Sequence, residues 1–217
     1  MAHLRAALFD LDGTLVDSLA DLGAALASAL AVVGLAPPDD AALRTMIGLG
    51  ARTLVERAVA GRADVDRVLA DFRDAYRARP IVETRLYPGI ASALDRLTDA
   101  GLTFAVVSNK PHDLTVTLAA QLLAPWPFAA IYGQRPAVPL KPDPTAALCA
   151  ADELGVPPTT CAFIGDSAVD IATARAAGMR AIGVAWGFRG RAELDAADAD
   201  VVVDEPAALV TAITSPT

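Results

Sequence analysis

Apolar and polar positions along the chain show two patterns, short continuous apolar runs and a helical periodicity of three to four residues. A short apolar run over residues 4–9 ends at a glycine turn, and this pattern predicts a buried β-strand. Over residues 19–33, apolar positions recur at three- and four-residue spacing, which predicts a helix with one apolar face. Further helices are predicted at 40–47, 51–60 and 64–79. No convincing strand is predicted from residue 17 to about residue 82, so this block is expected to be entirely helical.

The rest of the chain alternates short apolar runs with helical stretches. Strands are predicted at 103–107, 128–132, 160–164, 181–185 and 201–203. Helices are predicted at 88–100, from Pro111 to just before Pro125, at 145–154, up to Gly178 and at the end of the chain. Strands and helices that alternate at this spacing form a parallel sheet with helices on both faces. The expected fold is therefore α/β, a Rossmann-like, doubly wound parallel core with an inserted all-helical block.

The helical block is expected to form a domain of its own. We predict a core of residues 1–16 and 83–217, and an inserted helical cap of residues 17–82. The hinges between them are expected near 14–18 and 80–87. The last three residues, Ser-Pro-Thr, are expected to be frayed.

Composition narrows the class of protein. The chain has 217 residues, is 54% hydrophobic and carries a net charge of −8 without a basic block, so no nucleic-acid partner is expected. It contains no run of about 18 apolar residues and does not begin with a signal-peptide pattern, so we expect a cytoplasmic protein without a membrane partner. Cys149 and Cys161 are expected to be interior thiols. Only two histidines are present, neither beside an obvious nucleophile, which argues against a Ser-His-Asp hydrolase or a His-ligated zinc enzyme.

Two carboxylates follow the first predicted strand. In extended geometry, the spacing of Asp10 and Asp12 directs both side chains to the same side. Two like charges this close need a cation, a proton on one of them, or both. An ionised carboxylate as nucleophile beside a protonated neighbour is what phosphoryl transfer requires. The competing interpretation is an Asp-Gly turn in which Thr14 and Asp17 cap the next helix.

A second acidic pair follows the strand predicted at 160–164, and strand ends of this kind meet where ligands bind in such folds. Asp166 and Asp170 join Asp10 as hard oxygen ligands suited to Mg²⁺. The three carboxylates carry three negative charges, which Mg²⁺ and Lys141 together would balance. A capping box with Ser167 would account for Asp170 without any chemistry, but it leaves Asp166 unexplained.

Polar residues also follow the strand predicted at 103–107. Ser108 and Asn109 precede a helix, where an anion is favoured, although on their own they fit an ordinary helix cap better. Of the 18 basic residues in the chain, only Lys110 and Lys141 are lysine. A compact ammonium fits beside a phosphoryl group where a planar guanidinium fits poorly, so Lys141 is predicted to lie at the site. For Lys110, a solvated position near a helix start stays open.

Together these motifs resemble the four ordered motifs of the haloacid dehalogenase superfamily. They are Asp10-Leu11-Asp12-Gly13-Thr14, Ser108-Asn109, Lys141-Pro142 and Gly165-Asp166-Ser167-Ala168-Val169-Asp170. The block at 17–82 resembles the helical cap of that family. Within it, residues 47–51 and 54–58 resemble the cap of the bacterial phosphoglycolate phosphatase branch. Outside the cap, that branch is also resembled by Ser108-Asn109-Lys110-Pro111 and by Gly187-Phe188, followed by Ala199-Asp200.

The resemblance implies a role for each motif residue. Asp10 is implied to be the nucleophile that forms an aspartyl-phosphate, Asp12 the general acid and base, and Lys141 a catalytic phosphoryl contact. The implied metal ligands are Asp10, Asp12 (through its backbone carbonyl), Asp166 and Asp170, the last either directly or from behind. The implied substrate-binding residues are Thr14, Arg52, Ser108, Asn109 and Lys141. For Arg52, the alternatives are contact with a substrate carboxylate and a surface position.

The expected activity is Mg²⁺-dependent hydrolysis of a small phosphate monoester, with 2-phosphoglycolate as the main candidate. Monomer and homodimer stay open. A sugar-phosphate mutase of the β-phosphoglucomutase type is the rival, because its core motifs would be the same, and another small-molecule phosphatase or a pyrophosphatase is less favoured. Asp12 argues against a dehalogenase, and the lack of lysine in the cap argues against a phosphonate-cleaving enzyme. A catalytically inactive binding protein would show decay in at least one motif, and none shows it.

Overall fold

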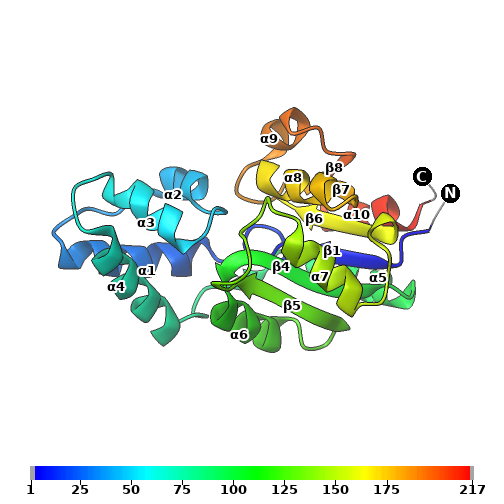
Figure 1. Ribbon diagram of the computed structural model, residues 1–217, viewed down its shortest axis with the longest axis horizontal. Coiled ribbons are helices and arrows are strands. Elements are labelled where there is room, and N and C mark those ends of the chain that lie inside the picture. The colour runs from blue at the N-terminus through cyan, green and yellow to red at the C-terminus, as the bar shows by residue number, and fades with distance from the viewer. Residues whose placement is uncertain (1–2, 216–217) are drawn as a thin grey trace.

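The computed structural model describes residues 3–215, and its elements gather into two bodies (Figure 1). One body is a sheet flanked by helices. The other, which we call the helical lobe, consists of the helices between Leu19 and Ala78. The described part of the chain begins and ends on the side of the sheet body that is remote from the lobe (Figure 1). Of the tail predicted to be frayed, Pro216 and Thr217 lie outside the described residues.

The sheet has six parallel strands in the order β5-β4-β1-β6-β7-β8. They are β1 (Ala6–Phe9), β4 (Thr103–Pro111), β5 (Phe128–Gln134), β6 (Cys161–Gly165), β7 (Arg180–Val184) and β8 (Val201–Val203). Central β1 pairs with β4 on one side and with β6 on the other, so the order of the strands reverses beside it. This arrangement confirms the predicted doubly wound α/β core, and it makes the carboxyl end of β1 the expected ligand position.

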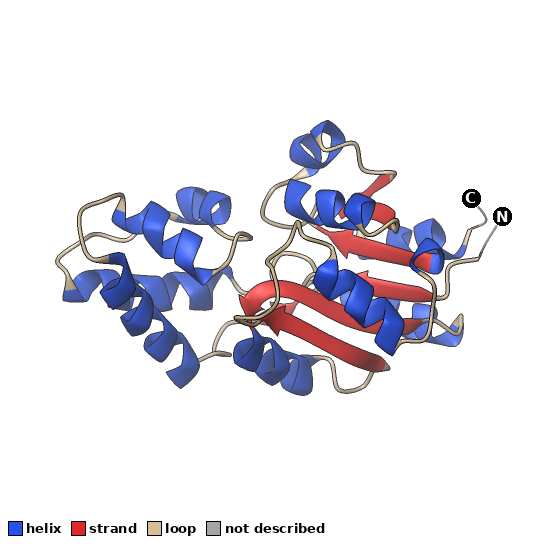
Figure 2. Ribbon diagram, viewed as in Figure 1, coloured by secondary structure: helices blue, strands red, loops and turns tan. Residues whose placement is uncertain are grey.

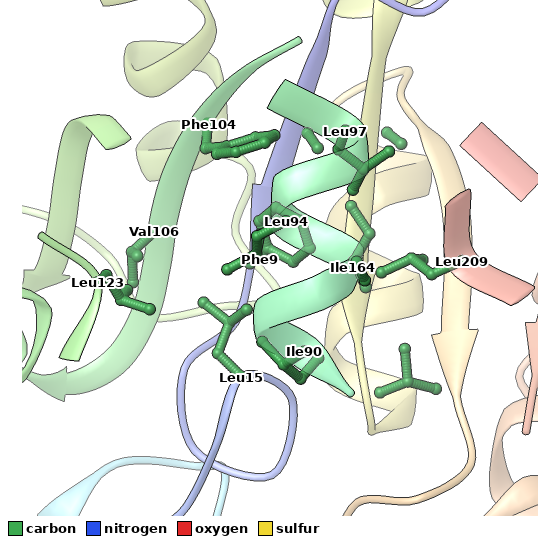
Figure 3. Close-up of a cluster of buried hydrophobic side chains, with 14 of the residues drawn as sticks. Phe9, Leu15, Ile90, Leu94, Leu97, Phe104, Val106, Leu123, Ile164 and Leu209 are labelled. Atoms are coloured by element: carbon green, nitrogen blue, oxygen red, sulfur yellow. The ribbon is translucent and has the colours of Figure 1, made fainter. Parts of the chain in front are cut away.

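Helices cover both faces of the sheet (Figure 2). Helices α5 (Ile90–Asp99), α6 (His112–Leu122) and α10 (Pro206–Thr214) pack on one face, and α7 (Thr145–Glu153), α8 (Ala168–Ala176) and α9 (Arg191–Ala196) on the other. Successive side chains of a strand point to opposite faces. Phe9 therefore packs with Leu94 and Ile164 in the first layer (Figure 3), whereas Leu8 packs in the second. Both faces of β1 are therefore buried up to its last residue, Phe9, and Asp10 follows directly at the carboxyl end of the strand.

The helical lobe has an apolar core of its own. It comprises α1 (Leu19–Val32), α2 (Asp40–Met46), α3 (Ala51–Val59) and α4 (Val65–Ala78). Leu26, Leu30 and Phe72 are among the residues of this core, which takes only Leu114 from the sheet body among the described buried residues. All four helices were predicted from their spacing of apolar residues. Among the described helices, none has the length and apolar character needed to cross a membrane.

The two bodies are joined by a short ribbon that the sequence pattern does not predict. Strands β2 (Val16–Asp17) and β3 (Arg85–Leu86) pair antiparallel, and two-residue strands are too short to show a rhythm. Beside this ribbon, the buried carboxylate of Asp21 accepts hydrogen bonds from the backbone N–H groups of Val82, Glu83 and Thr84. The hydroxyl of Thr84 donates a further one at 2.6 Å. The start of the lobe is thus fastened to the segment by which the chain leaves it.

Two expectations need correction. Cys149 is exposed, because the face of α7 that meets the sheet carries Ala146, Ala147 and Ala150 instead; Cys161 is buried, as predicted. In addition, β4 continues to Pro111, so that Lys110 belongs to the strand and not to a loop after it. The extension matters because the residues that β4 carries at this end reach both the site and the lobe.

Candidate active site

Asp10 lies directly after β1 and is buried. Its Oδ1 accepts the N–H of Leu11 at 2.7 Å and lies 3.0 Å from the Lys141 ammonium. No hydrogen bond to its Oδ2 is formed within the described part of the chain. Burial raises the pKa of Asp10 to about 6 against the opposing effect of Lys141, with further contributions from the neighbouring Asp170 and Asp12 carboxylates. One oxygen is therefore held in place, while the other forms no hydrogen bond with the described residues.

Three carboxylates converge at this point. One oxygen from each of Asp10, Asp166 and Asp170 lies within 4.8 Å of the other two, and all three residues are buried. Burial, reinforced by repulsion from Asp170 and Asp10, raises the pKa of Asp166 well above its ordinary value. Lys141 supplies a single compensating charge. Because buried charge of one sign is strongly unfavourable, this donor set fits a divalent cation with oxygen ligands, such as Mg²⁺.

The backbone around Asp166 leaves no space for side chains. A Cβ added to Gly187 would lie 2.3 Å from the Asp166 Cβ and 2.3 Å from the carbonyl oxygen of Gly13. A Cβ on Gly13 would lie 2.4 Å from an Asp166 carboxylate oxygen. The N–H of Phe188 donates to the same oxygen, Oδ2, at 2.6 Å. Gly187 and Phe188 are therefore part of the site, although no chemical feature of these two residues predicts that position.

Asp170 is held from both sides. Its Oδ2 accepts hydrogen bonds from the backbone N–H and hydroxyl of Ser167, and its Oδ1 accepts one from Lys141 at 2.7 Å. The predicted capping box of α8 is thus present, and the ion pair exists beside it. Burial alone would lower the pKa of Lys141, but Asp10 and Asp170 together raise it to about 12, so the ammonium stays charged.

Asn109 connects Lys141 to the lobe. Its Nδ2 donates to the carbonyl oxygens of Lys141 and of Gly48 in the lobe, and its Oδ1 accepts the N–H of Lys141 at 2.8 Å. The side chain thus positions Lys141 and contacts the lobe. Neither Asn109 nor Ser108 caps α6, whose N-cap is Pro111. Ser108 lines the cavity described below, and its Oγ accepts only a long, 3.4 Å hydrogen bond among the described residues.

Lys110 is the site residue whose position the sequence left open. Its ammonium lies 2.9 Å from both carboxylate oxygens of Asp12 and 2.6 Å from the hydroxyl of Tyr76, which belongs to α4 of the lobe. Its side chain is 2% exposed, so the alternative of a solvated lysine is wrong. The Ser18 hydroxyl also donates to Asp12, and Ser18 is the N-cap of α1. Thr14 and Asp17 therefore do not form a capping box there, although the Asp17 carboxylate accepts the N–H of Leu19 at 3.2 Å. The rarity of lysine in the chain was the available signal for Lys110.

A cavity of about 50 Å³ lies between the sheet body and the lobe. By the usual measure this is room for only a few water molecules. Its sheet-side wall is polar and includes Asp10, Asp12, Ser108, Asn109 and Lys110. Its lobe-side wall is apolar except for Tyr76, and includes Leu22, Ile47, Leu54 and Phe72. Asp10 and Asp12 thus border one cavity, although Asp10 is paired with Lys141 and Asp12 with Lys110.

Two of the predicted substrate-binding residues do not line this cavity. Arg52 is half exposed on α3 and forms ion pairs with Asp66 and Glu56 within the lobe, so the structure does not bring it to the other site residues. Thr14 is buried, and its hydroxyl has no hydrogen-bond partner among the described residues. Its carbonyl oxygen accepts a hydrogen bond from the Trp186 indole at 3.0 Å.

Comparison with known proteins relates this architecture to a large group. The family model for haloacid dehalogenase-like hydrolases matches residues 7–184. A phosphoglycolate phosphatase of Pseudomonas putida is 37% identical, with 98% of this chain and 80% of that protein covered. One from Agrobacterium fabrum is 39% identical, with 95% and 91% covered. A crystal structure from Lactobacillus delbrueckii subsp. bulgaricus superposes with a TM-score of 0.93 at 32% identity, covering 100% of both chains.

Proposed function

Because the chain belongs to the haloacid dehalogenase-like hydrolases, we propose that it is a Mg²⁺-dependent phosphatase that hydrolyses 2-phosphoglycolate through an aspartyl-phosphate intermediate. The observation that carries this proposal is the buried Asp10 carboxylate. One of its oxygens is fixed by Leu11 and Lys141, and the other is free beside two further carboxylates. Acidic residues that only face solvent would not be buried together with one carboxylate oxygen fixed in place, so this arrangement supports a catalytic role for Asp10.

In the first step, the free Oδ2 of Asp10 attacks the phosphorus of the substrate. A bond forms between Oδ2 and phosphorus, the ester P–O bond breaks, and its electron pair leaves with the alcohol oxygen. Asp12, which borders the same cavity, donates a proton to that oxygen. In the second step, Asp12 takes a proton from water, the water oxygen bonds to phosphorus, and the bond to Asp10 breaks, which releases phosphate.

The remaining polar residues stabilise the charge of the phosphoryl group. Asp10, Asp166 and Asp170 would hold Mg²⁺, together with the backbone carbonyl of Asp12, with Asp170 acting directly or from behind. When bound, the ion neutralises negative charge on the phosphoryl oxygens and the carboxylates. Lys141 orients Asp10 and contacts a phosphoryl oxygen, and the Ser108 hydroxyl donates to another. Asn109 acts through Lys141, whose backbone it holds on both sides.

The lobe supplies the wall that excludes water. We assign residues 17–82 as a cap domain on a core of residues 1–16 and 83–217, with the β2–β3 ribbon as the hinge. Closure of the apolar lobe wall over the polar wall would shield the aspartyl-phosphate from untimely water. The small size of the cavity favours a substrate of few atoms. The names of the relatives from Pseudomonas putida and Agrobacterium fabrum support 2-phosphoglycolate as that substrate.

A substrate panel tests the proposal. We expect a higher kcat/KM for 2-phosphoglycolate than for glycerol phosphate, hexose phosphates, nucleoside monophosphates or pyrophosphate. Activity should vanish with excess chelator and return with Mg²⁺. Incubation with β-glucose 1-phosphate should release phosphate or give nothing. Formation of glucose 6-phosphate would instead show a mutase, and full activity in chelator would contradict the metal requirement.

A further inference from the structure

One buried charge has no part in the mechanism above. Lys141 orients the nucleophile, but Lys110 forms no ion pair with Asp10, Asp166 or Asp170 within the described part of the chain. Burial of an ammonium is unfavourable unless it serves a partner. The Lys110 side chain is 2% exposed, and Asp12 is its one ion-pair partner among the described residues. Lys110 thus places a second buried ammonium at the cavity.

The walls of the cavity single out the same pair of residues. Among the described residues that line it, Lys110 is the one cation, and Tyr76 is the one lobe residue with a polar side chain. The ammonium lies 4.5 Å from the centre of the Tyr76 ring, and it donates to the phenol oxygen at 2.6 Å. The hydroxyl hydrogen of Tyr76 is then left to donate, and no acceptor for it is present in the part of the chain described. Tyr76 is 1% exposed, so bulk water does not readily supply that acceptor.

The location matches a definite part of a substrate. Asp12 serves the ester oxygen, and both of its carboxylate oxygens lie 2.9 Å from Lys110. A group carried on the carbon next to that ester oxygen therefore arrives beside Lys110 and below the lobe. The lobe wall there consists of apolar side chains such as Leu54 and Phe72. An anionic group entering this region is stabilised only if a cation and a hydrogen-bond donor meet it.

We propose that Lys110 and Tyr76 bind a second anionic group of the substrate, a carboxylate on the carbon that bears the phosphate ester. The proposal rests on the proposed phosphatase function and deepens it, since it names the residues that select an acidic phosphate monoester over a neutral one. Lys110 supplies the charge from the core, and Tyr76 supplies a hydrogen bond from the lobe. Both are specificity residues, distinct from the groups that act on the phosphorus.

The competing role for Lys110 is to neutralise Asp12 and nothing more. In that case its loss would slow all phosphate esters by the same factor. The two roles are separated by measuring kcat and KM for 2-phosphoglycolate and for 2-hydroxyethyl phosphate, in which a neutral hydroxymethyl group replaces the carboxylate. The ratio of the two kcat/KM values is the preference. Any general damage to Asp12 cancels in this ratio.

We expect Lys110→Met to reduce the preference roughly 10- to 100-fold, the effect of losing one hydrogen bond between charged groups, with a rise in KM for 2-phosphoglycolate only. Tyr76→Phe should reduce it about 3- to 10-fold. Lys110→Arg, which keeps the charge, should retain most of it. Arg67→Met removes an exposed cation of the same helix as Tyr76, outside the cavity, and should leave the preference unchanged.

Each outcome has a separate meaning. If the wild type shows no preference for 2-phosphoglycolate, the proposed substrate is wrong, and this inference fails with it. If the wild type shows the preference and Lys110→Met retains it, only this inference is overturned. If Lys110→Met does not fold, Tyr76→Phe and Lys110→Arg decide. An undiminished preference in Tyr76→Phe, or its complete loss in Lys110→Arg, overturns the proposal.

Discussion

Lys110 and Lys141 are equally buried, each with a side chain 2% exposed, but they belong to different environments. Lys141 bridges Asp10 and Asp170, and all of these residues come from the sheet body. Lys110 bridges Asp12 of the sheet body and Tyr76 of the lobe. The phosphoryl end of the site is therefore complete within the sheet body, whereas the other end needs the lobe. In the proposed function, the residues around Lys141 act on the phosphoryl group, and Lys110 and Tyr76 select the substrate.

The largest effect should come from the phosphoryl end. Asp10→Asn keeps the shape of the side chain but removes the nucleophile, and we expect a loss in kcat of about 10⁴-fold or more, as for the nucleophile of other covalent catalysts. Asp12→Asn should lose only roughly 10²- to 10⁴-fold, the usual contribution of general acid–base catalysis. Steady-state kinetics with thermal melts as the folding control measure both. Turnover of Asp10→Asn above about a tenth of wild type would remove Asp10 from the nucleophile's role.

The two lysines should respond differently to arginine. Lys141→Arg should lower kcat by about 10²-fold, because one compact charge is shared between two carboxylates and a displacement of about 1 Å is expensive there. Lys110→Arg should lower kcat by less than about 10-fold, since a guanidinium suits the two oxygens of a single carboxylate. The melting temperature should change little in the first variant. Near-wild-type kcat in Lys141→Arg would show that the ammonium is not in the phosphoryl site.

Removal of metal should produce a pH-dependent loss of stability at the phosphoryl end. The pKa of Asp10 is raised from 3.8 to about 6 in the folded protein. Between pH 3.8 and about 6, the folded protein therefore keeps a proton on Asp10 that the unfolded chain has released. The contribution of this proton to stability is complete below pH about 4 and disappears as the pH rises through about 6. Asp166 acts in the same direction. Mg²⁺ should replace the lost protons, and should therefore raise the melting temperature by several degrees at pH 7.5 and by little at pH 5.

Thermal melts with Mg²⁺ or chelator at the two pH values measure this difference. Asp166→Asn should abolish the Mg²⁺-dependent rise, and Arg67→Met, on the surface of the lobe, should preserve it. An equal rise at both pH values would show that the ion does not bind at the three carboxylates.

The smallest effect is expected for the cation that lies away from both lysines. Arg52→Ala should change kcat/KM for 2-phosphoglycolate by less than about 2-fold, since its ion pairs with Asp66 and Glu56 are exposed and do not reach the cavity. The same assay as for the lysine variants measures it. A loss above about 10-fold would return Arg52 to the substrate-binding role that the resemblance suggested.

The parts of the fold that sequence pattern predicts are those whose environment follows from local periodicity. The buried strand ending at Phe9 and the lobe helix containing Phe72 both show it, because each places apolar side chains on a face set by its own geometry. The β2–β3 ribbon has no such periodicity, since two paired residues are stabilised by partners about 70 positions apart in the chain. The exposure of Cys149 was missed for a related reason. A helix composed largely of small residues does not reveal which face meets the sheet.

By itself the sequence determined which residue types were available and where strands would deliver them. The acidic pairs after two strands, with a rare lysine, were sufficient to predict a phosphoryl-transfer site. Only the tertiary structure decided how these groups are paired. It paired Lys110 with Asp12 and Tyr76, joined the Asn109 side chain to the backbone of Lys141, and left Arg52 on the surface. The physical reason is that pairing depends on distances between segments far apart in the chain, and these are set by packing of the two bodies and not by local spacing.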